Sequence, residues 1–296
     1  MPLVPTASIV SSARQAGCGA AAFNVVHLET AEALVAAAEE ARAPLILQIS
    51  ENCVRYHGSL LPLLRATMTL AESSTADLAV HLDHVTDPDL VREGVAAGAG
   101  SVMVDASSLP YAANVATTAE LTAWCHERGV HVEAELGEVG GKDGVHAPGA
   151  RTDPGEARAF VAATGVDTLA VAVGSSHAMR ERTTVLDKDL IAALREALPV
   201  PLVLHGSSGV PDEELRRAIT AGMTKINIST HLVSVFTTSV RDTLGGQPAL
   251  VDSRKYLGPA REAVTKEAAR LLQVLGAAAA PPASTAPPVT ATLTQR

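Results

Sequence analysis

The chain has 296 residues and a mass of 30.4 kDa; 47% of its residues are hydrophobic and 19% are charged. This composition supports a large buried core and excludes a wholly disordered protein. The formal net charge is -9, which is the wrong sign for a protein that binds the phosphate backbone of nucleic acids. We therefore expect no nucleic-acid partner.

The cysteines and the N-terminal segment indicate a protein of the reducing cytoplasm. Cys18, Cys53 and Cys125 are widely spaced and form no CxxC motif, so neither a disulfide framework nor a cysteine-rich zinc site is predicted. The first residues lack a charged segment followed by an apolar one, and no run of about 18 apolar residues occurs elsewhere. We expect neither export nor a membrane partner.

Short apolar runs alternate along the chain with alanine-rich stretches that have helical spacing. Eight apolar runs predict β-strands at Ala20–Val25, Leu45–Ile49, Leu78–Leu82, Ser101–Val104, Val130–Leu136, Thr168–Val173, Pro201–Leu204 and Thr224–Ile228. The intervening helices are predicted at Glu29–Ala41, Asp87–Ala97, Ala112–Glu127, Pro154–Ala163, Asp187–Leu198 and Pro211–Ala221. Eight βα units predict an α/β fold, the parallel (β/α)8 TIM barrel.

This barrel is predicted to form one domain over residues 1–276. The remaining segment, residues 277–296, is rich in proline, alanine and threonine and has no apolar period that a core would bury. We expect it to be a disordered tail.

Histidines follow three of the predicted strands at the end where barrels of this kind place their active sites. One histidine near a strand end is more often a hydrogen-bonded structural residue than a metal ligand. His84, His177 and His205, however, follow the third, sixth and seventh strands, so three imidazoles can converge on one ion. Three histidines with an open coordination position are a catalytic zinc arrangement. The other histidines are expected to be structural or surface residues, namely His27, His57, His81, His126, His131, His146 and His231.

Asp83 directly precedes the first of these histidines. A carboxylate beside a metal-bound oxygen can accept and return a proton during a reaction. The alternative role for Asp83 is to cap the following helix, but Asp87 and Pro88 already provide a helix N-cap and a proline in the first turn. We therefore predict that Asp83 is catalytic.

Two turns after the last two strands lie where barrels commonly bind phosphate. They are Gly206–Gly209, which contains Ser208, and Asn227–Thr230, which contains Ser229. A phosphorylated small molecule is one interpretation, and ordinary polar βα loops are the other. A glycine-bearing stretch, Gly137–Gly144, is a candidate lid that would bring the carboxylate of Asp143 to the site.

Taken together, these motifs resemble the class II, metal-dependent ketose-bisphosphate aldolases, the group that acts on fructose and tagatose bisphosphates. The resemblance runs from about Ala22 to Ala263. Its most specific pieces are HLDH at 81–84, VEAELG at 132–137, LVLHG at 202–206 followed by SGVP at 208–211, and KIN at 225–227.

The resemblance implies a role for each matching residue. It makes His84, His177 and His205 the zinc ligands, and Asp83 the group that exchanges the proton of the C4 hydroxyl. Asp105 and Glu135 match a second, non-catalytic resting position of the metal. Arg254 matches an arginine that holds the far phosphate, and the remaining positions contact the substrate, mostly its ketone end and C1 phosphate: Asn24, Ser50, Gly206, Ser208, Asn227 and Thr230. The resemblance also implies a monovalent cation, Na⁺ or K⁺, and a homodimer or a higher homo-oligomer.

The sequence departs from the family pattern near the substrate. Val85, Ala106 and Ala178 stand where the family has glycine, and the added methyl groups are expected to narrow the site. Glu181 replaces a lysine, Ser229 and His231 replace the usual residues around Thr230, and Asp143 is one methylene shorter than the family's glutamate. These changes affect positions associated with phosphate, the monovalent cation and proton transfer at C3.

The sequence thus predicts a zinc-dependent aldolase that reversibly cleaves fructose or tagatose 1,6-bisphosphate to dihydroxyacetone phosphate and glyceraldehyde 3-phosphate. Two alternatives stay open. One is an aldolase specialised for another phosphorylated ketose or sugar acid, and the other is a degenerate relative that binds a metal or a phosphosugar without cleaving it.

Overall fold

The structure, a computed structural model, describes residues 3–136, 151–177, 179 and 181–277. Eight parallel strands pair in chain order, and β1 also pairs with β8, so the sheet closes into a barrel. The strands are β1 Ala20–Asn24, β2 Leu45–Ser50, β3 Leu78–Val85, β4 Ser101–Val104, β5 His131–Glu135, β6 Thr168–Ala170, β7 Leu202–Leu204 and β8 Met223–Ile228. The predicted TIM barrel and its eight strands are confirmed.

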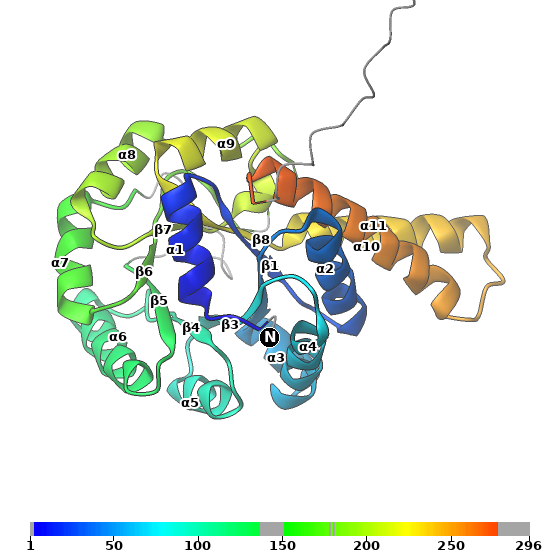
Figure 1. Cartoon of the computed structure of the whole chain (residues 1–296), viewed down its shortest axis with the longest axis horizontal. Helices are drawn as coiled ribbons and strands as arrows, with labels where there is room; N and C mark the ends of the chain where they lie inside the picture. The colour runs from blue at the N-terminus through cyan, green and yellow to red at the C-terminus, as the bar shows by residue number, and fades with distance from the viewer. Residues whose placement is uncertain (1–2, 137–150, 178, 180, 278–296) are drawn as a thin grey trace, which may run out of the picture.

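Helices surround the barrel (Figure 1). They are α1 Thr6–Ala16, α2 Leu28–Ala41, α3 Glu51–His57, α4 Leu61–Ser73, α5 Pro88–Ala96, α6 Tyr111–His126, α7 Pro154–Thr164, α8 Lys188–Ala197, α9 Asp212–Ala221, α10 Thr230–Gly246 and α11 Arg254–Val274, with a 3₁₀ turn at Ser207–Gly209. Six of these helices match the predicted ones. Of the predicted tail, the described part is Ala277 alone, so the domain boundary remains a prediction.

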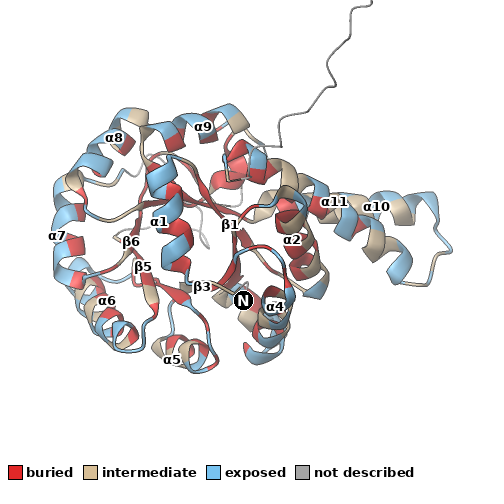
Figure 2. Ribbon diagram, viewed as in Figure 1, coloured by how far each residue is buried: buried red, intermediate tan, exposed pale blue. Residues whose placement is uncertain are grey.

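Burial follows the layers of the barrel. In Figure 2 the strands are buried, and the outer helices turn a buried face inward and an exposed face to solvent. The principal core lies between the strands and the helices and is built mainly from alanine, valine and leucine. Inside the barrel, Met103, Ala170 and Val203 form a small separate cluster.

The first helix, which the sequence pattern did not reveal, closes the N-terminal end of the barrel. Its buried residues Ile9, Val10 and Ala13 pack against inward-facing side chains of β1, β2 and β3. The hydroxyl of Thr6 lies 2.6 Å from that of Ser101 on β4. The interior is thereby sealed at this end, which leaves the opposite end of the barrel for a site.

A second unpredicted feature is the pair α10 and α11, which projects from the barrel as a hairpin (Figure 1). Along α10 only Leu232 is buried, and Val235 and Phe236 pack against the principal core while partly exposed. By contrast, α11 buries several apolar residues, and Thr265 donates a hydrogen bond to the carbonyl of Ala33 in α2. The hairpin is therefore anchored on the barrel through α11.

His81 occupies the middle of the barrel interior and is fully buried. Its Nδ1 lies 2.8 Å from the hydroxyl of Ser101. Burial, assisted by the nearby Lys225, lowers the pKa of His81 from its ordinary value of 6.5 to about 3. The folded protein therefore keeps this imidazole neutral at pH values at which the unfolded chain protonates it.

We expect His81 to make the fold sensitive to acid. As the pH falls below 6.5 the unfolded chain gains a proton that the folded chain cannot bind, so stability is lost until the folded pKa is reached. Between pH 7.5 and 5.0 this costs about 2 kcal/mol. Urea unfolding of the chelator-treated protein at both pH values should show His81→Asn losing about that much less stability than the wild type. An equal loss would contradict the assignment.

Candidate metal centre and active site

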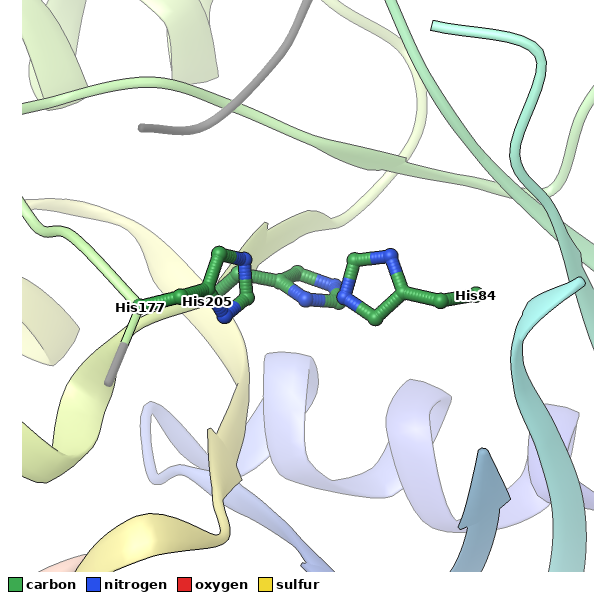
Figure 3. A group of neighbouring side chains, drawn as sticks. All are labelled: His84, His177 and His205. Atoms are coloured by element: carbon green, nitrogen blue, oxygen red, sulfur yellow. The ribbon is translucent and has the colours of Figure 1, made fainter. Parts of the chain in front are cut away.

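Three histidine rings from separate segments meet at the C-terminal end of the barrel (Figure 3). His84 is the penultimate residue of β3, His177 follows β6 and His205 follows β7. Their ring centroids are 4.6 to 5.7 Å apart, and one nitrogen of each ring lies within 4.8 Å of a nitrogen of the others. The predicted convergence is therefore found in the structure, and the cluster has the donor set that zinc prefers.

An irregularity in β3 lets neighbouring residues serve the same site. The pairing of β3 with β4 shifts register between Leu82 and Val85, and His84 has a left-handed backbone with φ of 50°. Adjacent residues of a regular strand point to opposite faces. The irregularity instead places Asp83 and His84 together at the mouth of the barrel. A left-handed histidine is uncommon, and such backbone positions concentrate at functional sites.

Hydrogen bonds select which ring nitrogen of His84 and of His205 can bind a cation. Nδ1 of His84 lies 2.7 Å from a carboxylate oxygen of Asp105. A carboxylate only accepts, so Nδ1 donates and Nε2 is left as the ligand atom. In His205 the pattern is reversed, because Nε2 lies 2.9 Å from a carboxylate oxygen of Glu133 and 3.2 Å from the side-chain amide nitrogen of Asn227, and Nδ1 is left as the ligand atom. Burial, followed by the neighbouring His84, lowers the pKa of His205, which favours the neutral form that a metal needs.

A second group at the same place contains His84, Asp105 and Glu135, whose potential ligand atoms also lie within 4.8 Å of one another. Both carboxylates are almost fully buried. Asp105 accepts hydrogen bonds from His84 through Oδ2 and from the hydroxyl of Ser107 through Oδ1. The structure thus brings Asp105 and Glu135, the two residues of the predicted resting position of the metal, together beside His84, while the role itself remains a prediction.

Asp83 faces this cluster as a buried carboxylate. Its Oδ2 accepts a hydrogen bond of 3.0 Å from the side-chain amide of Asn24, and Ser50 is its register partner on β2. Burial alone would raise the pKa of Asp83, but the surrounding His84 and His205 lower it below its ordinary value. The group is therefore ionised at neutral pH. Helix α5 is capped by Asp87, as predicted, so Asp83 is not needed as a helix cap.

Buried polar atoms without a hydrogen-bond partner indicate whether the site is suited to a ligand. Among the described residues, Oδ1 of Asp83 and Oδ1 of Asn227 are buried and have no hydrogen-bond partner. Buried polar atoms are nearly always paired in folded proteins, so these oxygens mark where a bound group would supply the missing donor. Together with the three imidazoles, they fit a hydrated or substrate-bound divalent cation.

The two predicted phosphate turns also lie together at this end. The hydroxyl of Ser208 accepts hydrogen bonds from the backbone N–H groups of Ser229, at 3.3 Å, and His231, at 3.1 Å. Thr230 begins α10, so the first N–H groups of that helix point into the same corner. Gly206 follows His205 with a φ of 69°. The Gly206 and Asn227 turns therefore form one contiguous surface beside the metal ligands.

Gly206 should tolerate no side chain. A Cβ atom there would lie 2.6 Å from the carbonyl oxygen of Ser176, and the left-handed backbone adds a cost of about 1 to 2 kcal/mol for a residue other than glycine. We expect Gly206→Ala to lower the free energy of unfolding by at least that amount in urea titrations. Gly245→Ala is the control, because a Cβ atom there meets nothing within 4 Å. Equal stability of the two variants would show that the turn can relax.

Of the predicted site residues that the structure describes, Arg254 lies apart from this cluster. Asp143 and Ala178 lie outside the described residues. Arg254 begins α11, has 88% of its side chain exposed and pairs with Asp252. Thr230 and Arg254 are separated by the length of α10, which is 17 residues or about 25 Å. Within one chain the structure does not bring Arg254 to the histidines.

The expected narrowing of the site by added methyl groups is wrong for Val85. Its side chain belongs to the core between the strands and the outer helices, where Val104 is its pairing partner on β4. The irregularity that turns Asp83 and His84 toward the mouth also turns Val85 away from it. Ala106 is buried directly after Asp105, and Glu181 is exposed.

Comparison with known proteins identifies the family. The family model described as fructose-bisphosphate aldolase class-II matches residues 4–280. A protein of Bacillus subtilis strain 168 described as a probable fructose-bisphosphate aldolase is 40% identical over 268 residues, which cover 89% of this chain and 94% of that protein. The chain belongs to the class II fructose-bisphosphate aldolase family. It is therefore a carbon-carbon lyase of a family that uses a divalent metal and acts on phosphorylated sugars.

Solved structures agree with this membership. The YdjI aldolase of Escherichia coli K12 is 31% identical and superposes with a TM-score of 0.82 over 93% of this chain and 98% of that one. A putative fructose-1,6-biphosphate aldolase from Coccidioides immitis is 28% identical, with a TM-score of 0.83 over 92% of this chain and 96% of that one. None of the described helices combines the length and apolar character that crossing a bilayer requires.

Two site residues of this aldolase escaped the sequence analysis. Gln48 is fully buried on β2 and donates a hydrogen bond of 3.2 Å to Asn24, which in turn donates to Asp83. Glu133 contacts His205 from below. A signal for Glu133 was present, because it stands two residues before Glu135 and residues two apart on a strand share a face. Gln48 likewise stands two residues before Ser50.

Proposed function

We propose that this protein is a zinc-dependent aldolase that cleaves a ketose 1,6-bisphosphate, fructose or tagatose 1,6-bisphosphate, to dihydroxyacetone phosphate and glyceraldehyde 3-phosphate. The observation that carries the proposal is the meeting of His84, His177 and His205 directly beside the ionised carboxylate of Asp83. A metal ligand set and a base in contact with the same small volume are what cleavage of a C–C bond next to a carbonyl requires.

Breaking the C3–C4 bond requires a base at one carbon and an electron sink at the other. Asp83 takes the proton of the C4 hydroxyl, so that C4 leaves as an aldehyde and the bonding electrons pass to C3, beside the C2 carbonyl. C3 then takes up one proton, which completes dihydroxyacetone phosphate. Zinc, when bound by the three histidines, supplies Lewis-acid polarisation of that carbonyl. Asn24 fixes the orientation of Asp83 through Oδ2, which leaves Oδ1 for the substrate proton.

The phosphate of the ketone end is assigned to the turns that contain Ser208, Asn227, Ser229 and Thr230. The chain carries a net charge of -9, so a phosphate must be held by local donors, and backbone N–H groups at the start of α10 supply them. Gly206 belongs to the first of these turns, and Ser50 is the register partner of Asp83. A monovalent cation near this phosphate and a carboxylate from Asp143 at C3 remain predictions.

A panel of phosphorylated ketoses tests the proposal. Release of dihydroxyacetone phosphate is followed from fructose 1,6-bisphosphate, tagatose 1,6-bisphosphate and the corresponding monophosphates, before and after treatment with a strong chelator. We expect one bisphosphate to be cleaved fastest and chelation to abolish the reaction. Cleavage that persists in protein shown to be free of zinc would remove the metal-dependent mechanism.

A different phosphorylated ketose or sugar acid is the second candidate substrate. It is favoured by Glu181, an exposed carboxylate where the resemblance calls for a lysine, and by the position of Arg254 far from the cluster. Slow turnover of both bisphosphates alongside rapid cleavage of another panel member would select it. Zinc binding without cleavage of any member would select the degenerate, non-enzymatic alternative.

A homodimer is also part of the proposal. If Arg254 binds the far phosphate, it can do so only in the site of a second copy, because α10 separates it from the histidines of its own chain. The projecting hairpin provides the reach for such a contact (Figure 1). Sedimentation equilibrium would decide the oligomeric state, and a monomer with full activity would reject this role for Arg254.

A further inference from the structure

A buried ion pair lies directly beneath His205. One carboxylate oxygen of Glu133 is 2.9 Å from Nε2 of His205, and the other is 2.7 Å from Nζ of Lys225. All three side chains are only 1% exposed. They come from β5, the end of β7 and β8, so they meet inside the barrel rather than along one strand. The reaction proposed above uses neither Glu133 nor Lys225.

A contribution to the stability of the fold does not explain why Glu133 and Lys225 are both charged residues inside the barrel. Removing ions from water is costly, and replacing a buried ion pair by uncharged groups of similar volume is often neutral or stabilising. Lys225 is also unsuited to act as a nucleophile, because its ammonium is held by Glu133 and shielded from solvent. A covalent lysine mechanism therefore gives no reason for the pair.

The contacts of Glu133 with His205 and Lys225 give a reason for the buried ion pair. Glu133 can only accept from Nε2 of His205, which fixes the proton on that nitrogen and turns Nδ1 into the ligand atom. The nearby positive charge of Lys225 offsets the cost of burying Glu133, so that the carboxylate stays ionised.

We propose that Glu133 and Lys225 act together as positioning residues for the metal. Lys225 keeps Glu133 charged, and the charged Glu133 orients the ring of His205 and makes its Nδ1 a stronger donor to the cation. This inference rests on the proposed function, because it takes His84, His177 and His205 as zinc ligands.

The double variant Glu133→Gln/Lys225→Met separates charge from shape. The glutamine keeps an oxygen that accepts from His205, the methionine keeps most of the lysine volume, and no uncompensated ion is left in the core. Zinc affinity is measured by competition with a chromophoric chelator. We expect the double variant to bind zinc about 10- to 100-fold more weakly than the wild type. Glu32→Gln is the matched control, because it removes a carboxylate that pairs with Arg261 at the surface, and its affinity should be unchanged.

The outcomes are distinguishable. If the wild type itself binds no zinc, the proposed function is wrong. If the wild type binds zinc and the double variant binds it equally well, the metal-positioning role is wrong and the pair is only structural. A test that does not depend on folding of a variant is nitrogen NMR of histidine-labelled, zinc-loaded wild type. It should show His205 protonated at Nε2 and metal-bound at Nδ1, and metal at Nε2 would overturn the inference.

Discussion

Replacement of Asp83 by asparagine is expected to lower kcat for ketose cleavage by about 10²- to 10⁴-fold while zinc stays bound. The asparagine amide preserves the volume and polarity of the side chain, but it cannot take a proton from a hydroxyl group. Asp83 lies beside the three histidines and contacts Asn24 through Oδ2, so its loss removes the base and leaves the metal ligands in place. Steady-state kinetics and metal analysis on the same preparation measure both effects.

Asp87→Asn is the control for this experiment. It makes the same chemical change four residues later, in a side chain that caps α5 by accepting from the backbone N–H of Asp89. Asparagine caps helices as well as aspartate does, so both activity and stability should be retained. If Asp83→Asn instead releases the zinc or fails to fold, the residue is a metal or structural group and its assigned role is wrong.

Replacement of His177 by alanine should remove most of the bound zinc and lower kcat/KM on the order of 10³-fold. A Lewis acid contributes several kcal/mol at the transition state, and each 1.36 kcal/mol is a factor of ten in rate. His177 stands well beyond the end of β6 at Ala170, whereas His84 lies within β3 and His205 directly follows β7. The change should therefore disturb the barrel less than a substitution at His84 or His205.

His126→Ala serves as the comparison for the metal experiment. His126 ends α6, is 42% exposed and contacts Asp167 on the opposite end of the barrel from the site. Its removal takes away an imidazole without touching the cluster. Zinc content measured on both variants after dialysis decides the matter, and a His177→Ala protein that keeps a full complement of zinc would exclude His177 as a ligand.

A chain of side-chain amides holds the carboxylate of Asp83, the residue that we propose as the base. Gln48 donates to Asn24, Asn24 donates to Asp83, and the three side chains come from β2, β1 and β3. Each donor fixes the orientation of the next group, so the carboxylate is held before the substrate arrives. Preorganised dipoles of this kind stabilise the ionised state without rearrangement during the reaction.

The sequence by itself determined the barrel and the end of the barrel at which the three histidines meet. Eight apolar runs separated by helical stretches leave little choice of topology, because parallel strands require crossover helices and eight such units close. It also determined that His84, His177 and His205 would stand at the same end, since each follows a strand and all strands of a barrel point the same way. The sequence also showed that Asp83 is not needed as a helix cap, because Asp87 and Pro88 form the N-terminal cap and first turn of α5.

The tertiary structure decided what local patterns do not encode. The register shift in β3 turns Asp83 and His84 to the same side and sends Val85 into the outer core, whereas strand alternation alone predicts opposite faces for neighbours. The pairing of Glu133 with both His205 and Lys225 joins residues 72 and 92 positions apart, so only the closed barrel could reveal it. The separation of Arg254 from the site likewise follows from how α10 and α11 pack, a matter of contacts between helices rather than of composition.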